Sequence, residues 1–213
     1  MTNKNDKKFN SLLTELCNFA RNLGASEAVV ISARDIVLDE RVLLKCMVPM
    51  CANYGVNLTC PPNSISFDDF KRILGKYSCA ILLKISDIAN DKPEGMKGQN
   101  SLSEIWKSNT IDGMDYLQAL RQGQEKLYSI IEKIESLCLQ KGYNFAAGLS
   151  AGGCSLCDEC VGKSSKLPCR HPFKARPSME GMGIDVMATA SKAGMKLEFN
   201  QGTSSWVGLI LVD

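Results

Sequence analysis

Four cysteines in the C-terminal part of this chain constrain its fold more than any other feature of the sequence. They follow the pattern C-x2-C-x2-C-x8-C, and they are Cys154, Cys157, Cys160 and Cys169. Because the first three are only two residues apart from one another, one short loop can direct three thiolates toward a single centre. That arrangement is typical of a cubane iron–sulfur cluster. We call these four residues the C-terminal cysteine group.

Four thiolates can also bind zinc, so the spacing of the cysteines has to distinguish a zinc site from an iron–sulfur cluster. Structural zinc sites usually take their ligands from two short C-x2-4-C pairs that are far apart in the sequence, whereas here one loop supplies three. The spacing also differs from that of bacterial ferredoxins, because eight residues precede Cys169 and no proline directly follows it. We therefore predict an iron–sulfur cluster outside the simple ferredoxin fold. His171, the single histidine, is interpreted as a neighbour of the cluster or a surface residue, since four thiolates already suffice.

A second set of cysteines, Cys46, Cys51 and Cys60, has the spacing C-x4-C-x8-C and no obvious fourth member. We call it the N-terminal cysteine group. Three thiolates on a cubane leave one iron open to a substrate, a small ligand or another side chain. The remaining cysteines fall on predicted helices or a strand and are interpreted as small buried hydrophobic residues: Cys17, Cys79 and Cys138.

The amino-acid composition argues against a nucleic-acid-binding or membrane protein. With 213 residues and 45% hydrophobic content, the chain can bury an ordinary core without help from a metal. Its 25 lysines and arginines nearly balance 23 acidic residues, so neither a nucleic acid nor an anionic membrane is predicted as a partner. The first residues are polar, and no apolar run is long enough to cross a membrane. We expect a cytoplasmic protein, a compartment in which clustered thiols are usually metal ligands rather than disulfides.

Helical and extended patterns alternate along the chain, which predicts an α/β or α+β fold. We expect one domain over 1–213, a sheet-and-helix sandwich whose two cysteine-rich loops each follow a strand. A polar segment over 87–113 is expected to be a flexible excursion. Helices are predicted over 9–23, 67–74 with Ser66 as the cap, 116–140, and 179–193 with Ser178 as the cap. Extended segments are predicted over 28–31, 36–44, 79–85 and 145–149, followed by a hairpin of 195–199 with 206–212.

Two segments of the chain resemble a known family. One runs over 45–62 and contains C-A-N-Y-G, and the other runs over 153–186 and contains C-S-L-C and R-P-S-M-E. The resemblance is to an uncharacterised family of predicted metal-binding proteins, common in anaerobic bacteria and archaea, and it covers nearly the whole chain. It implies a metal site at both cysteine groups but brings no established reaction. It also draws attention to Arg176, Ser178, Glu180 and Asp185, which would line a pocket beside the C-terminal cysteine group if they are functional. The alternative is that Ser178 and Glu180 only begin a helix and that Asp185 faces solvent.

The function predicted from these residues is redox. Two 4Fe-4S clusters on the seven grouped cysteines would let the protein pass single electrons to a redox partner protein. One alternative is an enzyme whose open iron at Cys46, Cys51 and Cys60 acts as a Lewis acid or in sulfur transfer on a small anionic substrate. Another is an interaction protein with two structural zinc sites. A cluster of cations near the C-terminal cysteine group would suit an acidic partner or an anionic substrate: Lys163, Lys166, Arg170, Lys174 and Arg176.

Overall fold

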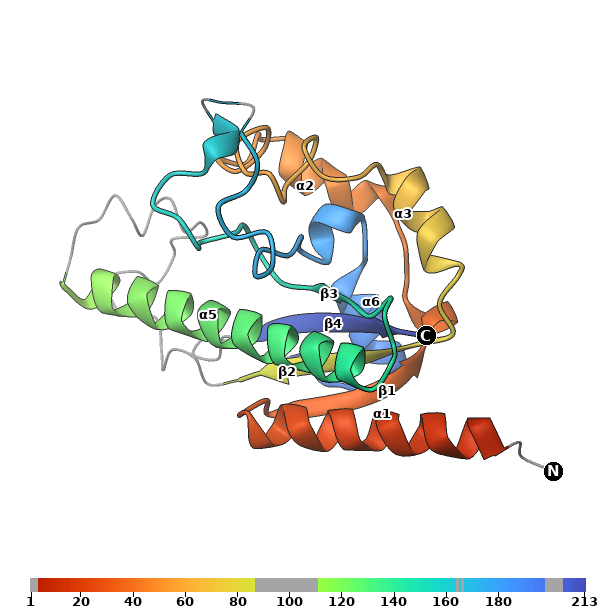
Figure 1. Ribbon diagram of the computed structural model, residues 1–213. Coiled ribbons are helices and arrows are strands. Elements are labelled where there is room, and N and C mark those ends of the chain that lie inside the picture. The colour runs from red at the N-terminus through yellow and green to blue at the C-terminus, as the bar shows by residue number, and fades with distance from the viewer. Residues whose placement is uncertain (1–3, 87–110, 164, 166, 198–204) are drawn as a thin grey trace.

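A four-stranded sheet forms the centre of the computed structural model, which describes residues 4–86, 111–163, 165, 167–197 and 205–213 (Figure 1). The strand order is β1-β2-β4-β3, and all three pairs of neighbours are antiparallel. The strands are β1 (Glu27–Ser32), β2 (Cys79–Ile85), β3 (Ala147–Leu149) and β4 (Trp206–Val212). An antiparallel sheet with helices packed on it makes this an α+β fold.

The two central strands are covered on both faces. Every residue of β2 is buried, and so is every residue of β4 except its first. Side chains alternate between the faces, so Ile81 packs in one hydrophobic cluster while its neighbour Leu82 packs in the other. This explains why both strands are continuous apolar runs rather than alternating patterns.

Helices α1 (Lys4–Asn22) and α5 (Ile111–Gln140) cover one face of the sheet (Figure 1). The apolar stripe predicted for each helix is the side that packs on the strands. Leu16 of α1 and both Leu127 and Ile131 of α5 have no exposed surface. Cys17 and Cys138 lie in this same layer, as expected for small buried hydrophobic residues.

The opposite face is covered by α3 (Phe67–Leu74), a 3-10 helix (Glu180–Met182) and α6 (Val186–Lys192). Helix α3 begins as predicted, because the Ser66 hydroxyl accepts a hydrogen bond from the Asp69 N–H at 3.1 Å. Met179 and Ile184, on either side of the 3-10 helix, have no exposed surface. The segment just after the C-terminal cysteine group is therefore anchored in the core.

The extended segment predicted over 36–44 was wrong in its second half. Two 3-10 helices lie here, one just before the segment (Ala33–Asp35) and one inside it (Glu40–Leu43), and the short helix α2 (Leu44–Met47) follows directly. Ile36 and Asp39 are extended, and Leu38 forms an isolated antiparallel bridge with Ile184. The Asp39 side chain starts the second 3-10 helix by accepting a hydrogen bond from the Arg41 N–H at 2.9 Å. The N-terminal cysteine group thus follows a helical segment, whereas the C-terminal cysteine group does follow a strand, β3.

The single helix predicted over 179–193 is also wrong, because the chain turns at Gly183. This glycine has φ 76°, which ends the 3-10 helix, and a Cβ here would collide with the Phe67 ring. Ser178 caps only the short helix, accepting from the Gly181 N–H at 2.9 Å. Asp185 caps α6 by accepting from the Ala188 N–H at 2.9 Å.

Two further predictions fall partly on residues that the structure leaves undescribed. In the predicted hairpin, β4 pairs with β2 and β3, residues 195–197 form no strand, and 198–204 lie outside the described residues. The excursion predicted over 87–113 lies outside them as far as residue 110, and its last three residues begin α5. None of the described helices is both long enough and apolar enough to span a bilayer.

Candidate metal centre

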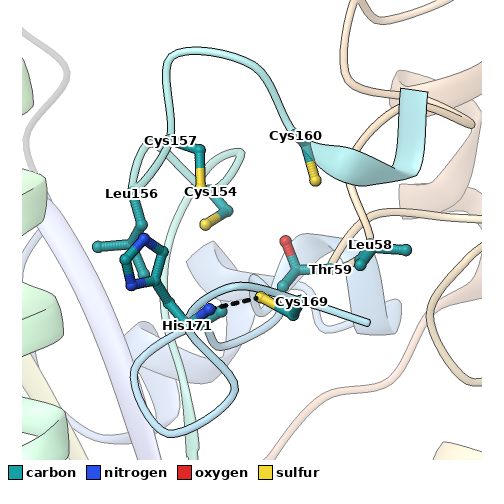
Figure 2. Close-up of a pocket in the computed structure, with 9 residues that line it drawn as sticks. Leu58, Thr59, Cys154, Leu156, Cys157, Cys160, Cys169 and His171 are labelled. Carbon is teal, nitrogen blue, oxygen red and sulfur yellow. Dashed lines mark hydrogen bonds between the residues drawn. The ribbon is translucent and has the colours of Figure 1, made fainter. Parts of the chain in front are cut away.

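The C-terminal cysteine group surrounds one hollow in the protein surface (Figure 2). All four of its cysteines line this hollow, and each is half-buried. Leu58 and Thr59, which immediately precede Cys60, close one side of it. The remaining lining residues are Leu156, His171 and Ala175. The sequence spacing and the three-dimensional arrangement therefore bring together the same four thiols.

The four thiols line the hollow without already meeting at one point. Among the residues that the structure describes, no three histidine, cysteine or acidic side chains are grouped so as to hold a metal ion. They nevertheless influence one another electrostatically. Burial raises the pKa of the Cys154 thiol, and negative charge on Cys169 and Cys157 raises it further.

Hydrogen-bond donors lie next to two of these sulfur atoms. The N–H of His171 donates to the Cys169 sulfur at 3.3 Å (Figure 2). The N–H of Leu156 and the hydroxyl of Tyr128 lower the pKa of Cys154, against the effect of its burial. Donors of this kind stabilise the thiolate, which is the form that binds metals. His171 thus acts on the group through its backbone, with its ring at the edge of the hollow.

Helix α5 holds the loop that leads into the C-terminal cysteine group. Gln124 is buried, and its side-chain amide donates to the carbonyls of Ala151 at 2.6 Å and Gly153 at 2.8 Å. Its carbonyl oxygen accepts from the Ser155 hydroxyl at 2.8 Å. Every polar atom of this side chain is therefore used to fix the backbone on both sides of Cys154.

The same face of α5 also anchors the chain after the last cysteine. Glu135 accepts from the Arg176 guanidinium at 2.6 Å and from the N–H of Gly148 at 2.7 Å. The Tyr128 hydroxyl donates to the Arg176 carbonyl at 3.2 Å. Sequence reasoning missed these positioning residues. The available signal is that Gln124, Tyr128 and Glu135 stand at positions i, i+4 and i+11, on or beside the apolar stripe of an amphipathic helix.

The N-terminal cysteine group is also gathered in space. Cys46 lies in α2, and its carbonyl accepts from the Cys51 N–H at 2.9 Å. Burial raises the pKa of the Cys60 thiol to about 11, and the charges of Cys51 and Cys46 act in the same direction. Burial likewise raises the pKa of Cys46, with a further contribution from Cys51. The three thiols predicted to share a metal site thus lie within electrostatic range of one another.

The loops that carry the two cysteine groups touch each other. In Figure 1 they lie together on the side of the sheet away from α1. The buried side chain of Asn57 donates to the Cys154 carbonyl at 3.2 Å, and the charge of Cys154 contributes to the raised pKa of Cys60. Gly153 lies so close to the Asn53 side chain that a Cβ here would overlap it. The two groups, about a hundred residues apart in sequence, therefore form one continuous cysteine-rich region.

Glu180 lies beside the N-terminal cysteine group, and its charge contributes to the raised pKa of Cys46. Burial raises the pKa of the Glu180 carboxyl, while the Ser178 hydroxyl, the Gly152 N–H and the charge of Lys45 oppose this rise. Its Oε2 atom is buried and has no hydrogen-bond partner among the described residues.

The pocket that the family resemblance implied is thus dispersed. Arg176 is held by Glu135, Ser178 and Asp185 cap short helices, and Glu180 lies by the other cysteine group.

The cations near the C-terminal cysteine group are only partly free. Besides Arg176, Lys163 pairs with Glu159 at 3.4 Å, and Arg170 donates to the Glu159 carbonyl at 2.9 Å. Lys166 lies outside the described residues, and Lys174 is exposed. Among the described members of the predicted cationic cluster, Lys163 and Arg176 are thus paired with carboxylates.

Comparison with known proteins gives one match. A family model described as "Predicted metal-binding protein (DUF2284)" matches residues 29–212, a span that includes both cysteine groups. No curated protein and no solved structure matches the chain.

Proposed function

This chain belongs to that family of predicted metal-binding proteins, and from this premise we propose that it is an iron–sulfur protein with two 4Fe-4S clusters that acts in electron transfer. One cluster would be held by the C-terminal cysteine group and the other by the N-terminal cysteine group. The observation that carries the proposal is that Cys154, Cys157, Cys160 and Cys169 all line one hollow.

The donor set of the hollow fits such a cluster. Four thiols match the cysteine ligation of a 4Fe-4S centre, and the spacing supplies three of them from one loop. The N–H of His171 donates to the Cys169 sulfur, and the Leu156 N–H and the Tyr128 hydroxyl lower the pKa of Cys154. Hydrogen bonds to ligand sulfurs are among the features by which proteins set the reduction potentials of clusters. When bound, the clusters would supply reversible uptake of single electrons.

The lining of the hollow favours an electron carrier over an enzyme there. Leu58, Leu156 and Ala175 present apolar surface, and Thr59 carries no charge. Among the described residues that line the hollow, His171 is the one titratable residue that is not a cysteine. General acid–base chemistry needs positioned titratable groups. An apolar lining instead limits the access of water to the site, which is one means of tuning a reduction potential.

A redox partner protein with an acidic surface is the proposed partner. Exposed apolar side chains occur next to both cysteine groups, which is typical of surfaces that bind other proteins. Val48 and Met50 lie between Cys46 and Cys51 of the N-terminal group, and Phe173 follows the C-terminal group with 83% of its surface exposed. The cations Arg170 and Lys174 lie beside Phe173 in the sequence and are exposed. A small anionic substrate would need the same cations but would leave the apolar side chains unused.

Metal analysis tests the proposal directly. The protein is purified without oxygen, and iron, acid-labile sulfide and zinc are measured together with the absorption spectrum. We expect about eight irons and eight sulfides per chain, the content of two cubanes under cysteine ligation. Zinc without sulfide would contradict the proposal and favour a structural metal site.

The variant Cys157→Ser assigns the C-terminal centre. Replacing one thiol of this group is expected to remove at least one iron per chain, because one iron of the cubane then lacks its ligand. The matched control is Cys17→Ala, which removes a buried thiol of α1 and is expected to keep the full iron content. Unchanged iron in Cys157→Ser would show that this cysteine is not a ligand.

A further inference from the structure

We propose that Glu180 is the fourth protein ligand of the N-terminal centre, where it binds the iron that Cys46, Cys51 and Cys60 leave open. The inference rests on the proposed function, because it assumes that these three cysteines hold a cluster. This ligand could not be found from the spacing of the cysteines, because it is a glutamate and lies more than a hundred residues after Cys60 in the sequence.

The segment that carries Glu180 is fixed against the loop of Cys60. A Cβ at Gly181 would lie 3.6 Å from Cδ of Pro61 and 4.0 Å from the Thr59 carbonyl oxygen, so the residue after Glu180 packs against the residues on both sides of Cys60. The N–H of Met179 donates to the Ser150 carbonyl at 2.8 Å, which ties the segment to the end of β3. Glu180 is thus held between the two cysteine loops by contacts on either side of it.

The carboxylate itself lacks a complete set of partners. Its Oε2 atom is buried without a hydrogen bond among the described residues, although buried polar atoms are nearly always paired. The charge of Lys45 acts on the carboxylate, but Lys45 is exposed. The carboxylate in turn acts on Cys46, which is a candidate metal ligand. A bound iron would pair this buried oxygen.

The chemistry of the site needs one more anionic donor, and a carboxylate can supply it. The Glu180 carboxyl would lose its proton to solvent, and the resulting carboxylate would donate an oxygen lone pair to one iron, with no electron transferred. A carboxylate is a harder ligand than a thiolate, so that iron would differ from the three bound by cysteine. A filled fourth position leaves no open iron for a substrate, which agrees with an electron carrier.

Three variants test the assignment: Glu180→Ala, Glu180→Gln and Glu180→Cys. Iron and sulfide are counted on anaerobically purified protein, and iron-57 Mössbauer spectra are recorded. We expect the wild type to show one iron with a distinct, oxygen-ligated signal among about eight. Glu180→Ala and Glu180→Gln should lose that signal and at least one iron, while the irons of the C-terminal group remain. Glu180→Cys should keep the iron content and convert the distinct signal into a cysteine-type one.

The control is Glu159→Gln, which changes an exposed glutamate next to Cys160 and should leave iron and spectra unchanged. The retained irons of the C-terminal group show that each variant is folded. Glu180→Ala and Glu180→Gln with full iron and the wild-type spectrum would overturn the inference while leaving two clusters in place. A wild type with four irons, all lost in Cys157→Ser, would also overturn it. A wild type without iron or sulfide would instead refute the proposed function.

Discussion

The ten cysteines of this chain occupy two different environments. Cys17, Cys79 and Cys138 are buried between α1, α5 and the sheet. The seven cysteines of the two groups are half-buried on loops that contact each other. The sheet region pairs its backbone polar groups in strands and helices, whereas the cysteine-rich region relies on turns and on side chains such as Asn57 and Gln124.

This difference shows that position in the fold, rather than residue type, separates a structural thiol from a candidate ligand. Burial raises the pKa of Cys79 and of Cys138 to about 11, and no cysteine of the two groups is among the residues that contribute to either value. Cys60 also reaches about 11, but the other thiols of its group contribute to that value. A bound metal ion would lower the pKa of such a thiol and compensate the burial.

The largest difference between the two cysteine environments is expected in the rate of thiol alkylation, measured on metal-free protein. We expect the grouped cysteines to react with iodoacetamide and the three core cysteines to remain unmodified, because they are both buried and protonated. Within the N-terminal group, Cys60 should react about a hundredfold more slowly than an ordinary thiol at pH 8, since its pKa is about 11 instead of 9.0. Its rate should keep rising up to about pH 11, where an ordinary thiol has already levelled off. Mass spectrometry of peptides measures each site; rapid labelling of Cys79 or Cys138 would contradict the comparison.

A core substitution should act on the sheet region alone. Leu82 of β2 has no exposed surface, so Leu82→Ala is expected to lower the free energy of unfolding by about 2–5 kcal/mol through the cavity it leaves. Iron content per folded chain should not change. Urea denaturation with iron analysis measures both quantities. Leu167→Ala, at a position with 62% of its surface exposed, is the control, with an expected change within about 0.5 kcal/mol. Iron loss in folded Leu82→Ala would show that the two regions are not separable.

The smallest effect on stability is expected for a substitution at Gln124, which joins the sheet region to the cysteine-rich region. Gln124→Ala removes hydrogen bonds to Ala151, Gly153 and Ser155, and it should cost about 1–3 kcal/mol because carbonyl groups are left without partners. We also expect faster loss of iron from the C-terminal centre to a chelator. Gln140→Ala, at the exposed end of the same helix, should change neither quantity. Equal behaviour of the two variants would mean that α5 does not hold the cysteine loop.

Much of the sheet region was predictable because its elements are long or clearly bounded. The apolar run Cys79–Ile85 is β2 as predicted, and Ser66 marks the start of α3. The stripe of α5 was predicted from its helical period. Helices of three or four residues carry no such period, so residues 40–44 were mistaken for extended chain. Likewise, a helix pattern continued through Gly183, where the backbone conformation breaks it.

For the candidate site, spacing alone predicted which four cysteines share one hollow. It did not predict that the N-terminal group adjoins them, because that contact depends on tertiary packing of two distant loops. Glu180 was noticed only through the family resemblance and was expected beside the C-terminal cysteine group. Its position next to Cys46 follows from the packing of the 3-10 helix on the Cys60 loop, which no local pattern encodes.

The hydrogen bonds of Asn57 have an evolutionary consequence. Its amide donates both to Asn53 in its own loop and to the carbonyl of Cys154 in the other, at 3.2 Å each. An insertion or deletion in either loop would move one acceptor out of reach, and the buried amide would then lack a partner. Changes in length in one loop are therefore expected to be tolerated only together with changes in the other. The two cysteine groups should be inherited, or lost, as a pair.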